Sequence, residues 1–596
     1  MCVVFVVMSG GIAMASIVAR KVKGMKQIAY YYHRTYRVKI SPSDAGKGPG
    51  SGPSRVKTED VYLGTAEDIR AKCRSAPEPE TVKLKDFGQV AAALAMVREL
   101  GIAEAVDAAV PKRRQGISVG TYVALGVIAK VCAPAVSWNR FGPWVQKTIL
   151  PSHLDLPESL LDAQNFWDHW DLILPQRTVG RRNPESPLLD DGAVLRIEEG
   201  IWERVREAYH VPLDCVLYDA TNFITYLGPE TAAELPQKGK SKEGRNELRI
   251  VGLAMAATRE LGLPLLSLVY QGNCHEARLL PESVARLVQR ITALHQDADQ
   301  LLLVFDKGQN SKRNLQWLHD IKIDVVGSLV PAHHAKLMAL PLSRYTQEHG
   351  GLLVWSGDRQ VHSLTAKVVL TYNRKLADRQ EWSFRRQLRR AEEALRACWE
   401  RQRGRPLPEA QAALAAVARR QRAGRFWRFE VADGQLLLRA DTVARRNRRS
   451  QFGKRILFTT RRSLTATEVL ETYNRDKARV EDDFRTLKDP DVVRFQPIRH
   501  WTDSKIRVYA LICVLALLVI KLMGYKAKRA GLDMSSVVLG RELADIREVY
   551  LLYDHLRVVH RLTHMSQVQR QLFEILGLAA YAPAEPSPPS LQTANG

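Results

Sequence analysis

The sequence predicts an α/β protein: a core with a mixed sheet, a helical domain before it, and a basic α+β domain inserted into it. Three observations support this fold class. Apolar residues recur at helical spacing over residues 85–180. Residues 214–329 alternate short apolar runs with amphipathic segments, and residues 371–462 concentrate positive charge. The length of 596 residues is enough for several domains at roughly 100–200 residues each.

We expect six segments along the chain. Residues 45–56 are rich in Gly, Pro and Ser, which is typical of a linker, and the Pro/Ser-rich tail over 581–596 is typical of disorder. The segments are an extension with its linker (1–57), the helical domain (58–205), the first part of the core (206–330), the basic insertion (331–462), the second part of the core (463–530), and a C-terminal helical region with the tail (531–596).

The helical domain is predicted from two stretches. Val90, Leu94 and Val97 lie at offsets 0, 4 and 7, which is one face of a helix. The segment Ile117–Cys132 is apolar and helical in character, and Pro134 would end it.

The core is predicted from five strands and two helices. Leu301–Phe305 is a continuous apolar run, as expected of a central strand that is buried on both faces. In chain order the elements are strands Asp214–Asp219, Arg249–Thr258 and Leu263–Tyr270, helix Leu279–His295, strand Leu301–Phe305, helix Ser311–His319 and strand Ile323–Leu329.

The insertion is predicted from its charge and its breaks. Residues 371–462 hold 25 Lys/Arg and 9 Asp/Glu, a net charge of 25 − 9 = +16. A helical stretch over residues 374–425 breaks at Gly404-Arg405-Pro406. Strands follow at Phe426–Val431, Gln435–Arg439 and Arg455–Thr459. This charge suits contacts to phosphate groups, and arginine-rich helices with merely solvated faces are the alternative.

The charge of the whole chain indicates the class of partner. Lys+Arg 88 against Asp+Glu 64 gives a formal net charge of +24. The hydrophobic fraction of 45% and the charged fraction of 26% exclude a wholly disordered, collagen-like or membrane-embedded chain. A positive field concentrates polyanions, of which nucleic acid is the commonest large one. Binding to an anionic membrane would require a basic amphipathic or lipidated anchor, and the sequence contains no evident one.

The cysteines and the apolar runs indicate a protein of the reducing cell interior. Seven cysteines are scattered without any Cys-x-x-Cys, so we expect neither a disulfide scaffold nor a zinc ribbon. The apolar run over residues 1–19 lacks the basic start of a signal peptide, and a start at Met25 fits as well. The run Val508–Ile520 is too short to span a bilayer and is predicted as a buried helix.

Two aspartates follow predicted strands of the core. Asp219 ends the strand that starts at Asp214, and Asp306 directly follows Leu301–Phe305. A carboxylate at the carboxyl end of a buried strand opens into a crevice, and two such carboxylates on neighbouring strands can hold divalent cations. Taken singly, each Asp also fits a turn or a helix cap.

A predicted helix over Ala466–Lys488 carries an unusual stripe of side chains. At about 100° per residue, five residues fall within a quarter turn of one another: Tyr473, Lys477, Glu481, Phe484 and Lys488. The mixture favours a carboxylate for a metal ion beside lysines for phosphates. A solvated ladder of Lys477 and Glu481 is the alternative. The neighbours Asp482 and Asp483 point about 100° and 200° away from Glu481.

These motifs resemble bacterial insertion-sequence transposases of the DDE class, in the branch with a Tyr-Arg-Glu-Lys signature. The resemblance rests on Tyr218-Asp219-Ala220-Thr221, Val304–Gly308 and Val480–Lys488, with further matches at Gly239–Lys242 and Arg499-His500-Trp501. The spacing of Glu481 and Lys488 fits the signature. The chain departs from the signature at two positions. Lys477 stands where the signature has Arg. Asn474 stands where the signature has Tyr, and Tyr473 lies one residue before that position.

The resemblance implies a ribonuclease H-like core in which Asp219, Asp306 and Glu481 bind two Mg²⁺ ions, with Mn²⁺ as a substitute. It implies an enzyme that cuts DNA at the terminal inverted repeats of its own element and transfers 3′-hydroxyl ends to target DNA. The helical domain would recognise the ends, and a homodimer would form on DNA. DNA contacts are expected from Lys240, Lys242, Arg245, Tyr473, Lys477, Arg485 and Lys488.

Such a protein is expected in the cytoplasm at the nucleoid, with no membrane partner. No G-x-x-x-x-G-K-[ST] motif is present, so we expect no use of ATP. Two alternatives remain at this stage. One is a ribonuclease H-like nuclease without strand transfer, and the other is an inactive DNA-binding derivative of a transposase.

Overall fold

The computed structural model describes eleven stretches of the chain: residues 4–8, 11–21, 29–38, 56–74, 79–111, 116–154, 156–175, 188–295, 301–432, 435–553 and 557–583. The predicted linker over 45–56 and the predicted tail over 581–596 lie almost wholly outside these residues. The chain divides into two compact units. The first takes in the described parts of 1–83 and 549–560, and the second takes in those of 84–548 and 561–585.

The first unit contains a four-stranded antiparallel sheet that the sequence analysis did not predict. Its strands are rich in β-branched and aromatic residues, which favour a pleated surface. In sheet order they are β1 (Val4–Met8), β2 (Gly11–Lys21), β3 (Ala29–Val38) and β4 (Val56–Thr65), followed by α1 (Ala66–Arg74). The chain passes between the units within β5 (Thr81–Asp86), β18 (Arg547–Tyr553) and β19 (Arg557–Leu562).

The second unit begins with the predicted helical region. Both helices expected from periodicity are confirmed: α2 spans Gly88–Glu99 and α4 spans Val119–Cys132. Ser118 caps α4 by accepting the amide of Thr121 at 3.1 Å, as a helix-starting serine commonly does. The other helices are α3 (Ile102–Ala109), α5 (Phe141–Val145), α6 (Leu150–His153), α7 (Ala163–Ile173) and α9 (Gly192–Tyr209).

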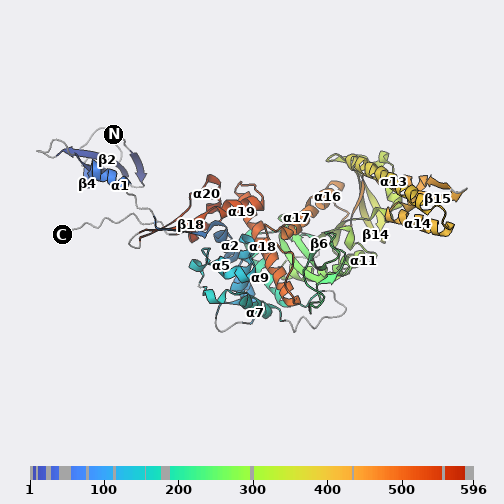
Figure 1. Ribbon diagram of the computed structural model, residues 1–596, viewed down its shortest axis with the longest axis horizontal. Helices are drawn as coiled ribbons and strands as arrows, with labels where there is room; N and C mark the ends of the chain where they lie inside the picture. The colour runs from blue at the N-terminus through green and yellow to red at the C-terminus, as the bar shows by residue number, and fades with distance from the viewer. Residues whose placement is uncertain are drawn as a thin grey trace. The chain divides into compact units, whose positions relative to one another are not determined.

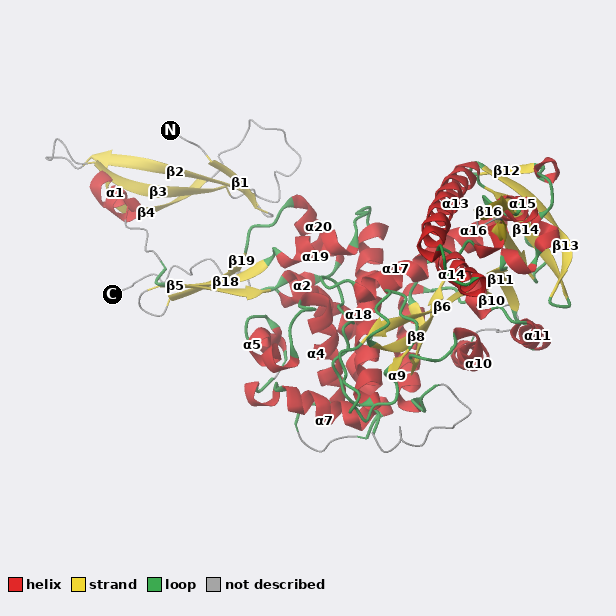
Figure 2. Cartoon of the chain, turned by 45° about the vertical axis from the view of Figure 1, so that its right-hand side comes forward, coloured by secondary structure: helices red, strands yellow, loops and turns green. Residues whose placement is uncertain are grey.

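A ten-stranded mixed sheet forms the centre of the second unit (Figures 1 and 2). Its order is β12-β13-β14-β17-β11-β10-β6-β8-β7, and β9 also pairs with β8. The pairs of β10 with β6 and with β11 are parallel, and the remaining pairs are antiparallel. The five predicted core strands are confirmed in the predicted chain order, with α10 (Glu276–Ala293) and α11 (Lys312–Asp320) between them. The five predicted strands correspond to β6, β8, β9, β10 and β11. All ten strands of the sheet are β6 (Cys215–Ile224), β7 (Gln237–Lys238), β8 (Arg249–Thr258), β9 (Pro264–Gln271), β10 (Leu302–Phe305), β11 (Asp324–Ser328), β12 (Gln347–His349), β13 (Leu352–Val361), β14 (Leu364–Tyr372) and β17 (Lys454–Thr459).

One expectation about β6 was wrong. Asp219 does not end this strand, because β6 continues to Ile224 through antiparallel pairing with β8. The parallel pairing with β10 does stop just before Asp219, at Leu217 opposite Val304. Continuing that register by two residues, beyond the paired part of the strands, would bring Asp219 opposite Asp306. Each aspartate thus lies two residues beyond the last paired residue of its own segment, Leu217 or Val304.

The basic segment combines a helical hairpin with strands of the central sheet. The predicted helical stretch is confirmed as α13 (Arg374–Gln402) and α14 (Leu407–Arg420), which are separated near the predicted break. The hairpin β15 (Trp427–Ala432) with β16 (Gln435–Ala440) follows, and then α15 (Thr442–Arg449). Figure 1 shows α13, α14 and β15 together, on the far side of β14 from β6. The strands β13 and β14 were missed, since polar residues over 357–360 interrupt the apolar pattern of β13.

The longest apolar helix is buried in the protein. α18 spans Asp503–Arg529, packs against α2, α4, α7 and β9, and is 94% buried over its most apolar window. Among the described helices it is the one that is long and apolar enough to cross a membrane, and its burial confirms the prediction of a core helix. The C-terminal helices α19 (Ser536–Ala544) and α20 (Gln567–Ile575) follow it.

A buried ionic network ties α18 to the helical region and to the sheet. The Arg507 side chain is fully buried; its Nε lies 2.5 Å from Asp191 Oδ2, and its Nη2 donates to the Ser267 carbonyl at 2.7 Å. Arg290 Nη2 lies 3.5 Å from Glu198 Oε2, and Arg507 Nη2 lies 3.8 Å from the other oxygen of that carboxylate. Burial raises the pKa of Glu198, and the two arginines oppose this shift. Breaking one such partnership leaves an unpaired charge in the interior.

We expect Asp191→Ala to lower the free energy of unfolding by about 3–5 kcal/mol, because it removes the carboxylate nearest to the buried Arg507 guanidinium. The surface substitution Asp358→Ala, which removes the partner of the exposed Arg462, is the matched control and should cost less than about 1 kcal/mol. Urea unfolding followed by tryptophan fluorescence measures both. Equal losses in the two variants would show that the network does not hold the fold together.

Candidate active site

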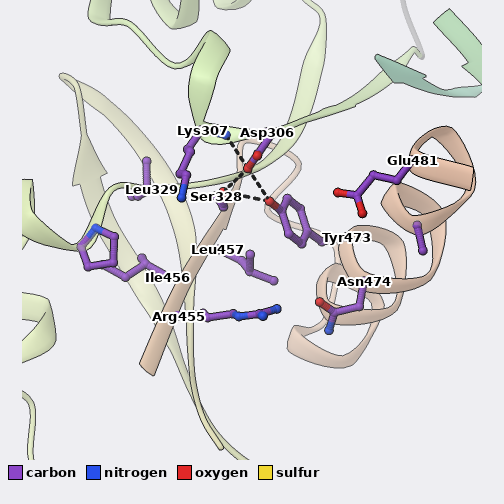
Figure 3. Close-up of a pocket in the computed structure, with 12 residues that line it drawn as sticks. Asp306, Lys307, Ser328, Leu329, Arg455, Ile456, Leu457, Tyr473, Asn474 and Glu481 are labelled. Carbon is purple, nitrogen blue, oxygen red and sulfur yellow. Dashed lines mark hydrogen bonds between the residues drawn. The ribbon is translucent and has the colours of Figure 1, made fainter. Parts of the chain in front are cut away.

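A cavity of about 370 Å³ opens at the ends of strands β10, β11 and β17. Its opposite wall belongs to the helical segment that begins with α16 (Ala466–Glu471) and ends with α17 (Lys477–Lys488). Asp306 and Glu481, which were predicted separately from two distant motifs, both line this strand-end cavity. Figure 3 shows their carboxylates on opposite sides of it, with Tyr473 between them.

Three donors fix the carboxylate of Asp306. Its Oδ1 accepts the amide of Lys307 at 2.7 Å and the Ser328 hydroxyl at 3.0 Å, and the Tyr473 hydroxyl lies 2.9 Å away (Figure 3). Ser328 comes from β11, whose parallel register places it beside the residue that follows β10. Charge-assisted hydrogen bonds of this kind hold a carboxylate in one orientation. Asp306 is thus preorganised by residues from two other elements.

The stripe of side chains was predicted for one continuous α-helix over Ala466–Lys488, and this prediction was wrong. A π-helical turn over Thr472–Asp476 separates α16 from α17. A π turn takes up about one extra residue. The eight-residue separation of Tyr473 and Glu481 then corresponds to about seven residues of α-helix, a rotation of roughly −20° instead of 80°. The wide turn therefore directs both side chains into the strand-end cavity, although Tyr473 comes one residue early for the signature.

The structure separates Glu481 from its two acidic neighbours. Asp482 is exposed and forms an ion pair with Arg485 on the same helix. Asp483 is buried and forms an ion pair with Lys521 of α18. Burial raises the pKa of Asp483 from 3.8 to about 6, and Lys521 opposes the shift. Glu481 is the one carboxylate of the three that lines the cavity.

Asp219 lies outside the lining of this cavity. Its Oδ1 accepts the amide of Ala220 at 2.8 Å, and its side chain is half-buried. In the part of the chain that the structure describes, no three His, Cys, Asp or Glu side chains are grouped closely enough to hold a metal ion. The structure thus brings Asp306 and Glu481 to one cavity and leaves Asp219 outside it, on the strand that pairs with β10.

Most of the predicted DNA-contacting cations are held by carboxylates. Lys488 Nζ lies 3.0 Å from Glu243, and Lys242 Nζ lies 2.9 Å from Glu276. The ammonium of Lys242 also donates to the Ala220 carbonyl beside Asp219.

The remaining predicted cations lie at the surface. Arg245 Nε lies 3.2 Å from Glu247, Arg485 pairs with Asp482, and Lys240 is exposed. The side chain of Lys477 lies outside the described residues.

Sequence reasoning missed two residues of the strand-end cavity. Ser328 ends β11, and Arg455 lies at the start of β17, in a strand that was predicted but given no function. Arg455 is exposed, and Figure 3 shows its side chain extending below Tyr473 toward Asn474. Among the described residues no carboxylate pairs with its guanidinium. The local signal was an arginine followed by a buried apolar strand, which alone does not indicate a site.

Comparisons with known proteins leave the family open. No protein-family model matches the chain, and no curated protein matches its sequence. Among solved structures, it is similar to a piggyBac transposase in a synaptic complex with hairpin DNA, determined by cryo-electron microscopy. The TM-score is 0.37 and the identity 10%, with 87% of this chain and 91% of that one covered. A similarity of this size is too low to establish a common fold.

The shifted pKa of Asp483 predicts a pH-dependent stability. The pKa of Asp483 is about 6 in the folded state and 3.8 for an unperturbed Asp, as in the unfolded chain, so the folded state binds the proton more tightly. The free energy of unfolding therefore falls as pH rises from about 4 to 7. Asp483→Asn removes this pH dependence. The free energy of unfolding of the variant should therefore rise, relative to that of wild type, by on the order of 3 kcal/mol between pH 4 and pH 7. Urea midpoints at four pH values measure it, with Asp482→Asn as the exposed control. A difference that stays constant with pH would contradict the assignment.

Proposed function

We propose that the chain is a metal-dependent DNA transposase of the DDE class, with a ribonuclease H-like core, encoded by a bacterial insertion sequence. It would bind the terminal inverted repeats of its element, cut them, and join the 3′-hydroxyl ends to target DNA. The observation that carries this proposal is the meeting of Asp306 and Glu481 in one cavity at the strand ends. Asp219 lies on the neighbouring parallel strand, two residues beyond its last pair with β10, and we propose it as the third carboxylate.

The chemistry of these donors fits a hard divalent cation. Carboxylate oxygens are the ligands that Mg²⁺ and Mn²⁺ take in such sites, and the hydrogen bonds of Asp306 keep that carboxylate oriented. We propose that Asp219, Asp306 and Glu481 hold the metal. When bound, Mg²⁺ would activate the attacking hydroxyl and stabilise the leaving oxygen. Tyr473 would act as a positioning residue through its hydroxyl contact with Asp306.

The cations around the site provide for the phosphates of DNA. Arg455 projects into the strand-end cavity, where its guanidinium can bind a phosphate in a bidentate manner. Lys488 and Lys242 would exchange their partners Glu243 and Glu276 for phosphates. Both pairs are partly open to water, which screens them, so this exchange costs on the order of 1 kcal/mol for each pair.

Two element ends must be cut and joined together, so two active sites must meet. We propose that two copies of the chain assemble on the paired ends. The formal charge of +24 supports assembly on DNA, because like-charged copies repel each other until the nucleic acid neutralises them.

The proposal is tested by cleavage of DNA that carries the inverted repeats flanking the gene. Asp219→Asn, Asp306→Asn and Glu481→Gln should each lower the cleavage rate in Mg²⁺ by more than the roughly 10–100-fold that loss of an outer-shell metal partner costs. Affinity for the same DNA in Ca²⁺ should stay measurable. Asp482→Asn, one residue from Glu481 but facing away from the cavity, is the control. Near-normal cleavage by any of the three variants would remove that residue from the site.

A second test addresses Arg455. Arg455→Ala should lower the cleavage rate and reduce the slope of log affinity against log salt by about 0.9, the contribution of one phosphate contact on duplex DNA. Arg455→Lys should recover the salt slope but only part of the rate, because lysine binds phosphate as a point charge. The exposed Arg462→Ala, which loses a surface pair with Asp358, serves as the control. An unchanged rate in Arg455→Ala would show that this residue does not contact the substrate.

A further inference from the structure

The side chain of Lys242 is held beside Asp219. Its Nζ donates to the carbonyl of Ala220, the residue that follows Asp219 in β6. The same Nζ lies 2.9 Å from Oε1 of Glu276, the first residue of α10. The Lys242 side chain is 43% exposed and that of Glu276 is 26% exposed, so a ligand can reach the ion pair from solvent.

The carboxylate of Glu276 also reaches the turn that follows Asp306. A Cβ placed on Gly308, two residues after Asp306, would lie 3.1 Å from Glu276 Oε2. Burial raises the pKa of Tyr218, and the carboxylates of Glu276 and Asp219 both add to this shift, so both lie near the tyrosine. The ion pair therefore spans the two chain segments that carry the proposed metal-binding aspartates.

The backbone of the loop over residues 239–246 fixes Lys242 in this position. The Lys242 amide donates to Asn222 Oδ1 at 3.1 Å, and Asn222 Nδ2 donates to the Lys240 carbonyl at 3.2 Å. Ser241, between the two lysines, is buried. Because β6 and the loop hold the lysine before any ligand binds, binding requires little ordering of the chain.

Lys488, the other lysine that we propose to exchange its partner for a phosphate, lies farther along the same strand. Its Nζ is 5.3 Å from the centroid of the Phe223 ring. Phe223 is four residues beyond Asp219, which is about 13 Å along a strand. Of these two lysines, Lys242 is the one beside the aspartate, and the two would contact different phosphates.

We infer that Lys242 is a catalytic residue that contacts the scissile phosphate of DNA, and that the Glu276 carboxylate marks the place of this phosphate in the DNA-free protein. This inference rests on the proposed function, since it takes cleavage of DNA as the reaction. The scissile phosphate must lie between the carboxylates that hold the metal, and the ion pair spans that interval. A phosphate oxygen can replace a carboxylate oxygen on an ammonium group. The lysine would then stabilise the negative charge that develops on the phosphate during cleavage.

The contact is measured with element-end DNA in which a neutral methylphosphonate replaces one phosphate at a time. Binding to the full chain is measured in EDTA, so that metal ions do not enter the comparison. At the scissile position the methylphosphonate should weaken binding to wild type about fivefold, as loss of one exposed charge pair does, and should not weaken binding to Lys242→Gln. Lys240→Gln, which changes an exposed lysine of the same loop, is the control and should keep the fivefold effect. An equal effect in wild type and Lys242→Gln, or a coupling of Lys242 to another phosphate, would overturn the inference.

A second measurement needs no substitution in the protein. The scissile phosphate is activated as a substituted pyrophosphate, which reacts with an amine in contact with it. The amine nitrogen attacks the DNA phosphorus, a P–N bond forms, and the outer phosphate leaves with the electrons of the broken P–O bond. Peptide mass spectrometry should find the adduct on Lys242. An adduct on a different lysine, or none with the DNA fully bound, would overturn the inference.

The catalytic role is read from cleavage rates in Mg²⁺ at saturating DNA. Lys242→Gln should lower the rate by roughly 10²–10³-fold, as loss of one donor to a developing charge does. Lys488→Gln should weaken DNA affinity but change the saturated rate less than Lys242→Gln does, because its phosphate is not the one that reacts. A normal saturated rate in Lys242→Gln would overturn this inference alone. Near-normal cleavage by Asp306→Asn would instead count against the proposed function.

Discussion

The charges buried around Arg507 are the interaction on which the arrangement of the second unit depends. Arg507 belongs to α18, Asp191 directly precedes α9, and Ser267 lies in β9, so one guanidinium joins three elements from distant parts of the chain. A fully buried arginine is tolerated only where its donors meet acceptors, which allows these elements one relative placement. That placement sets α18 against β9 and against α17. α17 is the helix that carries Glu481, so α18 links the buried network to one wall of the strand-end cavity.

The order of the core strands could be predicted from the sequence because burial on both faces leaves a direct trace. The runs before Asp219 and Asp306 are continuous and apolar, and such runs in a globular chain are central strands. The end of β6 could not be predicted in the same way. Its last residues pair with β8 on one side only, so the sequence there mixes polar and apolar residues. Where a strand stops depends on the length of its partners, and a local pattern does not contain this information.

The candidate site was predicted where chemistry and spacing coincide within one segment, and missed where it is assembled from several. Glu481 stood out because its helix places unlike side chains together. Ser328 and Arg455 gave no comparable signal, since each is a single polar residue at the edge of a strand. They reach the strand-end cavity only because β11 and β17 are neighbours in the sheet. Proximity that tertiary pairing creates is invisible to any reading of one segment at a time.

The π turn over Thr472–Asp476 has a consequence for how such chains diverge. A residue inserted into a helix normally rotates everything beyond it, so that a catalytic side chain would leave its pocket. A wide turn absorbs the insertion locally and returns the rest of the helix to its former phase. Tyr473 lies within this turn, and its hydroxyl contacts Asp306 across the strand-end cavity. A chain with one residue fewer between the tyrosine and the glutamate, and without the wide turn, would therefore place the two side chains on the same face of its helix.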